Sequence, residues 1–206
     1  MASSAVGPSP QGLRERNKAR TRQEIAAATL RLASERGLDH VTVEQIAAAA
    51  DVAPRTFFRY FDSKEDALLA DHSERLALLR ETLRARPVDE GPLTAVRAAI
   101  LEVVGDLEEQ REPMLCKMEL MQVNPGLRAH SLERMGDMER TLATALAERT
   151  GVDPERDLRP RLIAGAVVMA MRVAVEQWGE QDGRGDLRDM VEQALDLLDG
   201  GLDHSI

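Results

Sequence analysis

Between residues 42 and 61 the chain carries signals for two short helices joined by a very short connection. Thr42 followed by Gln45 forms a capping box, which predicts that a helix begins there. Pro54 suits the first turn of a helix, and it predicts a second short helix to about Phe61. With a longer helix expected before them, the segment has the outline of a helix-turn-helix, in which the second short helix enters the major groove of DNA. A generic helical hairpin has the same outline.

Composition favours an all-helical protein. Aromatic residues make up 2% of the 206 residues, whereas β-sandwiches and barrels normally depend on aromatic and β-branched side chains. Apolar residues instead recur at spacings of three and four, and Gly and Pro separate the segments. We therefore expect an all-α fold of about nine helices. The predicted helices span residues 17–36, 42–50, 54–61, 64–86, 93–110, 114–123, 127–150, 158–178 and 186–198.

Charge is unevenly distributed along the chain. The net charge is −9, but residues 1–61 contain nine Lys and Arg against six Asp and Glu. The remaining residues contain 18 against 30. A mildly basic N-terminal part is thus joined to an acidic body, so the overall acidity does not exclude DNA binding by the N-terminal part.

Several other classes of protein are disfavoured. The single cysteine, Cys116, cannot form an internal disulfide or a Cys-based zinc site, and the four histidines show no metal-ligand spacing. Because no phosphate-binding Gly-rich loop, paired-carboxylate motif or nucleophile elbow stands out, we expect no catalytic residue, no metal and no cofactor. Residues 1–13 are expected to form a disordered tail rather than a signal peptide. The longest apolar run, residues 162–171, is too short to span a bilayer. We expect a cytoplasmic protein with no membrane partner.

The second short helix carries the side chains expected to contact DNA bases. Arg55 and Thr56 lie at its start, where an arginine can donate two hydrogen bonds to a guanine and a threonine offers a hydroxyl and a methyl group. Phosphate contacts, which position a protein without specifying a sequence, are expected from nearby cations and hydroxyls. These are Arg59, Tyr60 and Lys64, with Lys18, Arg20 and Arg22 on the preceding helix. The alternative is that the cations form a solvated face. Phe57 and Phe61 are expected to pack inward in either case.

Residues 42–68, TVEQIAAAADVAPRTFFRYFDSKEDAL, resemble the DNA-binding signature of the TetR/AcrR family of transcriptional regulators. The capping Thr, the Ile-Ala pair, the Val in the turn, the Thr-Phe-Phe-x-Tyr-Phe run and the Ser-Lys-Glu-Asp restart occur together in register. The resemblance runs from about Arg20 to about Leu69. One departure is Ala53, where the family often has a serine that caps the second helix and offers a phosphate contact. The loss of such a cap costs about 1 kcal/mol.

The resemblance implies an all-α homodimer whose N-terminal domain binds a palindromic operator in double-stranded DNA. It places Arg55 and Thr56 at positions that contact bases. Other positions match residues that usually contact the DNA backbone, namely Thr42, Phe58, Tyr60 and Lys64. Many members have a tyrosine at Phe58, so the hydroxyl contact is missing in this chain.

The C-terminal part is unusually rich in methionine, which adapts to irregular shapes and is common at promiscuous binding surfaces. As a group these residues favour an apolar ligand pocket between the helices that begin near Leu93, Met114, Leu127 and Leu158. The candidate pocket residues are Met114, Met118, Met121, Met135, Met138 and Met169. The alternative for each methionine is that it fills the core, since apolar stripes on helices are usually core.

The segments 158–178 and 186–198 resemble the last two helices of the family, which pair with their copies in a four-helix bundle. Small side chains on the first of them support close packing. The candidate dimer-interface residues are Ala166, Val167, Ala170, Ala174, Trp178 and Leu195. A helix buried within one chain would satisfy the same residues.

The expected organisation is a helix-turn-helix DNA-binding domain of three helices over residues 14–62, a connecting helix over 63–86, and a ligand-binding and dimerisation domain over 87–206. The expected function is ligand-responsive regulation of transcription, with repression relieved by a small apolar or amphipathic effector. A helical carrier or enzyme without operator binding is an alternative, and so is an activator.

Overall fold

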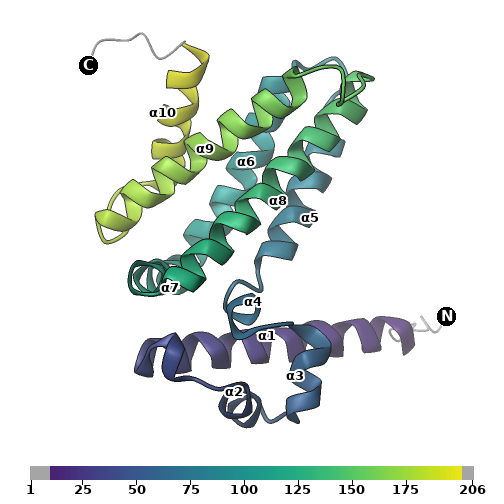
Figure 1. The fold of residues 1–206 in the computed structure, drawn as a ribbon. Coiled ribbons are helices and arrows are strands. Elements are labelled where there is room, and N and C mark those ends of the chain that lie inside the picture. The colour runs from purple at the N-terminus through teal and green to yellow at the C-terminus, as the bar shows by residue number, and fades with distance from the viewer. Residues whose placement is uncertain (1–9, 201–206) are drawn as a thin grey trace, which may run out of the picture. The chain divides into compact units, whose positions relative to one another are not determined.

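The computed structural model describes residues 10–200, with side chains from residue 16, and it divides into two compact units at Ala70 and Asp71 (Figure 1). Within the described residues the secondary structure is entirely helical, which confirms the expected all-α class. There are ten α-helices in this range rather than nine. Residues 1–9 of the predicted tail lie outside the described residues, and residues 10–13 lie in the first helix.

Unit 1 contains the helix-turn-helix. Its elements are α1 (Pro10–Arg36), the 3-10 helix η1 (Leu38–His40), α2 (Val43–Ala49), α3 (Pro54–Tyr60) and α4 (Lys64–Leu68). α1 packs against both α2 and α4, and α2 packs against α3. The small core between them is built on Ile25, Leu32, Ile46, Phe57 and Phe61.

Unit 2 is a larger helical bundle. Its elements are α5 (His72–Ala85), α6 (Pro92–Glu109), α7 (Arg111–Val123), α8 (Pro125–Thr150), α9 (Arg159–Glu180) and α10 (Leu187–Asp199). α5 packs on α6 and α8, and α9 lies against both α8 and α10 (Figure 1). One continuous apolar core joins these helices, with Leu79, Ile100, Leu142, Val167 and Trp178 among its most buried members.

The predicted connecting helix 63–86 is two helices, α4 and α5, and this break accounts for the tenth helix. The carbonyl of Ala70 accepts a hydrogen bond from Arg22 Nη2 at 2.7 Å. The sequence between the two helices contains no Gly or Pro, so no local signal marks the break.

Candidate nucleic-acid interface and ligand pocket

The turn between α2 and α3 is fixed by local hydrogen bonds. Thr42 caps α2 as predicted: its hydroxyl accepts from Gln45 N at 3.3 Å, and the Gln45 side chain accepts from Thr42 N at 3.0 Å. Asp51 has a positive φ of 53°, a left-handed conformation that Asp tolerates better than most residues. Val52 N then donates to Ala47 O at 2.9 Å, which closes the turn.

Helix α3 has one buried face and one exposed face. Phe57 and Phe61 are 0% and 4% exposed, which confirms that both pack inward. On the other side Arg55 is exposed, Thr56 is half-buried and Phe58 is 56% exposed. The two buried rings therefore fix which side chains α3 presents to solvent, and the predicted base-contacting residues are on or beside that exposed face.

Two of the predicted phosphate-contacting cations are hydrogen-bonded inside unit 1. Lys64 Nζ donates to Leu38 O at 2.8 Å and to Val41 O at 3.2 Å, which uses two of its three donors. Arg22 donates to Ala70 O, as described above, and to Tyr60 O at 3.4 Å. Its guanidinium also lies 4.6 Å from the centre of the Phe61 ring. These two cations hold the ends of helices in place.

The other predicted backbone contacts are at the surface of unit 1. Lys18 and Arg20 are exposed on α1, where Arg20 forms an ion pair with Glu24 at 3.3 Å. The Arg59 guanidinium lies 5.1 Å from the centre of the Tyr60 ring, and it donates to the Tyr60 hydroxyl at 3.5 Å. These cations keep their charged groups in solvent, unlike Lys64 and Arg22.

In unit 2, three of the predicted pocket methionines gather around one cavity of about 360 Å³. Met118 and Met121 come from α7 and Met135 from α8. The remaining lining residues are polar or charged except Leu132, and they are Gln122, Arg128, Ser131, Leu132, Arg172, Glu176 and Glu180. The contribution of α8 follows a helical spacing, because residues 128, 131, 132 and 135 share one face. This shared face is the feature of the sequence that could have indicated the polar side of the cavity. We call the cavity the α7–α9 pocket, because its lining residues come from α7, α8 and α9.

The other three predicted pocket methionines lie elsewhere. Met138 is 5% exposed and belongs to the core, and Met114 packs against that core. Met169 is 52% exposed on α9, where its sulfur accepts a hydrogen bond from Arg172 Nη2 at 2.9 Å. Arg172 also binds both carboxylate oxygens of Glu176, at 2.7 and 2.9 Å, on the rim of the α7–α9 pocket.

One glycine lets the α7–α9 pocket take its present shape. A Cβ added at Gly179 would lie 2.0 Å from Met118 Cε and 2.7 Å from its sulfur. The Met118 side chain therefore packs directly on the backbone of α9. Any larger residue at this position would force the methionine to move.

A buried ion cluster lies at the start of unit 2. Asp71 pairs with Arg75, and its Oδ1 lies 3.0 Å from Lys117 Nζ; Lys117, on α7, is only 8% exposed. Arg75 Nε also donates to Asp106 Oδ2 at 3.1 Å. Burial alone would raise the pKa of the Asp71 carboxyl, but the charges of Arg75 and Lys117 and the hydrogen bond from Lys117 hold that pKa below its usual value. The carboxylate is therefore kept in its charged form.

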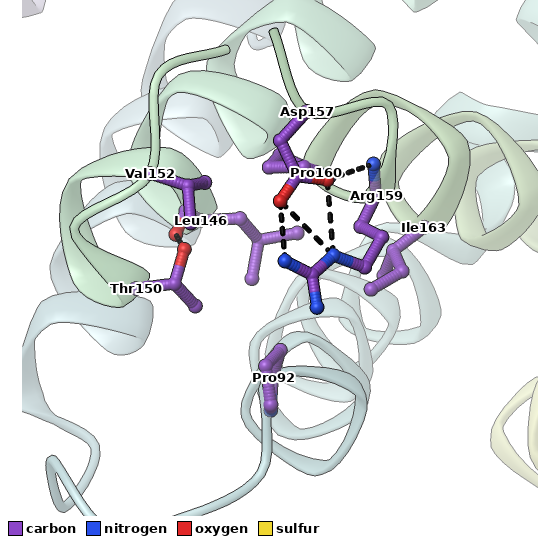
Figure 2. A pocket seen from close by; sticks show the side chains of 8 residues that line it. All are labelled: Pro92, Leu146, Thr150, Val152, Asp157, Arg159, Pro160 and Ile163. Atoms are coloured by element: carbon purple, nitrogen blue, oxygen red, sulfur yellow. Dashed lines mark hydrogen bonds and ion pairs between the residues drawn. The ribbon is translucent and has the colours of Figure 1, made fainter.

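A second, smaller pocket of about 230 Å³ lies where α6 begins, α8 ends and α9 begins (Figure 2). Its walls are mostly apolar, with Pro92, Leu146 and Ile163 among them. At its edge the Arg159 backbone and guanidinium donate to the Asp157 carboxylate, and these hydrogen bonds lower the pKa of Asp157 to about 2. The sequence gives no signal for this pocket, because distant segments form it.

The predicted dimer-interface residues face the inside of unit 2. Five of them are at most 8% exposed, namely Val167, Ala170, Ala174, Trp178 and Leu195, and Ala166 is half-buried. The reason is that α9 packs against both α8 and α10, which cover its small-residue face. The apolar side chains that α9 leaves exposed are different ones, Leu162, Met169 and Val173, and Leu158 at its N-cap is exposed too.

In residues 10–200 one helix, α9, is long and apolar enough by length and composition to cross a membrane. Of its apolar 18-residue stretch, 44% is buried inside the protein, as in the core helix of a helical bundle. Among the described side chains, no group of three or more His, Cys, Asp or Glu gathers to hold a metal ion.

Comparison with known proteins gives matches over nearly the whole chain. Residues 25–70 match the model of bacterial regulatory proteins of the tetR family, and residues 90–203 match the model of the MftR C-terminal domain. The transcriptional regulator TcmR of Streptomyces glaucescens is 38% identical over 83% of this chain and 78% of its own length.

Among solved structures, the repressor FadR of Thermus thermophilus, in complex with lauroyl-CoA, is similar with a TM-score of 0.62 and 25% identity. The match covers 90% of this chain and 96% of that one. The fatty acid degradation regulator FadR of Bacillus halodurans has a TM-score of 0.61 and 25% identity, over 90% of this chain and 97% of that one.

Proposed function

The chain belongs to the TetR family of bacterial transcriptional regulators, and from that premise we propose that it is a repressor. It binds a palindromic operator as a homodimer, and a small apolar or amphipathic molecule releases it. The observation that carries this proposal is the orientation of α3, whose two buried phenyl rings turn Arg55 outward at the start of the helix.

Arg55 and Thr56 contact bases in the major groove, where an arginine can donate two hydrogen bonds to guanine. Lys18, Arg20 and Arg59, together with the hydroxyls of Thr42 and Tyr60, contact phosphates on either side. Thr42 still has a proton to donate, because its hydroxyl acts only as an acceptor in the cap of α2. Lys64 keeps one donor for a phosphate, and Phe58 adds an apolar contact to the backbone. Arg22 instead holds α3 in position.

The homodimer forms through α9 and α10. An apolar surface for a second copy is supplied by Leu158 at the N-cap of α9, by Leu162, Met169 and Val173 on α9, and by Leu197 on α10. Two copies present two α3 helices, and a pair of half-sites 34–36 Å apart fits such a dimer. A single helix-turn-helix makes too few contacts for specific binding alone.

The effector occupies the α7–α9 pocket. The methionine side chains and Leu132 suit an apolar chain, and the charged residues at the rim suit a polar group attached to it. The FadR of Thermus thermophilus binds lauroyl-CoA on a similar fold, so an amphipathic acyl compound is the first effector to test. Its binding shifts the body to a conformation in which the two α3 helices no longer match successive major grooves.

The test is binding to the DNA directly upstream of the protein's own gene, compared with a shuffled duplex at the same salt concentration. Replacing Arg55 with Ala should weaken specific binding by about 1–3 kcal/mol, roughly 5- to 150-fold, and should leave binding to the shuffled duplex unchanged. Arg80→Ala, which removes an exposed arginine of α5, is the matched control.

Equal operator binding by the wild type and the Arg55 variant in a mobility-shift assay would refute the base contact. No specific shift at any moderate salt concentration would favour the helical carrier instead. For the effector, lauroyl-CoA at saturation should release the wild-type protein from the operator duplex, and failure to do so would exclude this acyl compound.

A further inference from the structure

Ala70 and Asp71 are consecutive residues, and each is held by a cation of its own unit. In unit 1, the Ala70 carbonyl accepts from Arg22 Nη2 at 2.7 Å. In unit 2, the Asp71 carboxylate lies 3.0 Å from Lys117 Nζ. The peptide bond that joins the two units is thus anchored on both sides by a specific polar contact.

On the unit 2 side, the cation that holds Asp71 comes from α7, the helix that supplies Met118 and Met121 to the α7–α9 pocket. Lys117 precedes Met118 on α7, and Met118 and Met121 line the pocket. The Lys117 ammonium group is 9% exposed and its Asp71 partner is 14% exposed. Because separating a buried pair leaves an uncompensated charge, Lys117 and Asp71 are expected to move together when α7 moves.

On the unit 1 side, the arginine that holds Ala70 also contacts the C-terminal end of α3. The Arg22 guanidinium bridges Ala70 O and Tyr60 O, and it lies over the Phe61 ring. A planar guanidinium that makes two hydrogen bonds and a ring contact is more strongly oriented than a single charge would be. A displacement of Ala70 is therefore transmitted to the C-terminal end of α3.

We propose that Lys117 and Arg22 are positioning residues that couple occupancy of the α7–α9 pocket to the direction of α3. This inference rests on the proposed function for its ligand and its DNA. A ligand that displaces Met118 and Met121 shifts α7, Lys117 moves Asp71, and the adjacent Ala70 moves the Arg22 bridge at the end of α3. By reciprocity, DNA that holds α3 lowers the affinity of the pocket for its ligand by the same factor.

The first experiment needs neither ligand nor operator. Amide hydrogen exchange is measured on the full-length protein and on Lys117→Met, which removes the charge, keeps an unbranched side chain one atom shorter, and leaves Asp71 paired with Arg75. Faster exchange is expected at residues 69–75 and also at the end of α3, residues 58–61. Increases confined to residues after Ala70 would overturn the proposal.

Glu108→Gln is the matched control for this experiment. Glu108 Oε1 accepts from the backbone N of Leu187 at 2.8 Å, so the substitution weakens another tie within unit 2 that does not involve Asp71. Exchange at the end of α3 should stay at the wild-type level. An equal increase at α3 in this variant would show general loosening and would also overturn the proposal.

The second experiment measures coupling with lauroyl-CoA as the probe and the upstream duplex as the DNA. Wild type should show a roughly 5- to 150-fold weaker affinity for the duplex when the probe is bound, the usual range of such coupling. Lys117→Met and Arg22→Lys should reduce this ratio toward one, whereas calorimetry should still show probe binding by Lys117→Met.

A wild-type ratio retained by both variants would overturn the inference while leaving the proposed function intact. If wild type does not bind the probe, the effector of the proposed function fails, and the exchange experiment alone decides the coupling.

Discussion

The sequence predicts a functional surface on both α3 and α9, but it indicates the inward face of the two helices to different degrees. The outward side of α3 is polar apart from Phe58, and its exposed Arg55 and buried Phe57 lie as the sequence predicted. The middle of α9 is apolar on every side, so its buried Val167 and its exposed Leu162 are both hydrophobic. Periodicity identifies the inward face only where the outward face is polar.

The difference between α3 and α9 can be tested by substitution, and the largest effect on stability is expected at Trp178. It is 1% exposed, and its Nε1 donates to Gly185 O at 3.3 Å. Trp178→Ala should lower the free energy of unfolding by about 3–5 kcal/mol, measured by urea titration with far-ultraviolet circular dichroism. Trp178→Phe should cost less and keep the fold measurable. A variant with unchanged stability but no dimer would show that Trp178 faces the partner, as the sequence suggested, and not the core.

A smaller effect is expected at the outward face of α9. Leu162 is 71% exposed, so Leu162→Glu places a charge in the proposed dimer surface without disturbing the core. The dimer dissociation constant should rise about tenfold or more, because an unpaired charge is costly to bury. Sedimentation equilibrium measures this directly. Val88→Glu, at a position 86% exposed before α6, is the control, and an equal response from both variants would argue against this surface.

The smallest effect concerns the start of α3. Ala53 has φ −73° and ψ 149°, the extended conformation of a capping residue, but alanine has no side-chain oxygen to accept a hydrogen bond. Ala53→Ser should stabilise α3 by about 1 kcal/mol, seen as slower amide exchange at residues 55–57. Ala49→Ser, near the end of α2, should give no such protection. Unchanged amide exchange in Ala53→Ser would mean that a side-chain cap does not stabilise α3.

Most of the helix-turn-helix could be predicted because its signals are local. The capping box at Thr42, the proline at position 54 and the aromatic run each act within a few residues. The roles of Arg22 and Lys64 could not be predicted in this way. The sequence predicts phosphate contacts for both, and in the structure both also donate to carbonyls that lie at least 23 residues away in sequence.

In unit 2 the class of fold was predictable, whereas the pocket residues were only partly so. Methionine content indicates the neighbourhood of α7 and α8, where three of the six candidate methionines line a cavity. It did not separate Met135, which lines the pocket, from Met138, which fills the core one turn later. A methionine is apolar in either place, so only the packing of neighbouring helices distinguishes the two.

The chain has one tyrosine and one tryptophan, and the division at Ala70 and Asp71 places them in different units. Tyr60 ends α3, beside Arg59, and Trp178 is buried close to the Gly179 backbone on which Met118 packs. Each unit therefore carries its own intrinsic fluorophore. Excitation at the long-wavelength edge of the absorption band selects the indole and therefore unit 2 alone, so ligand entry and the unfolding of unit 2 can be followed without any label. Phenol emission reports the DNA-binding unit in the same sample.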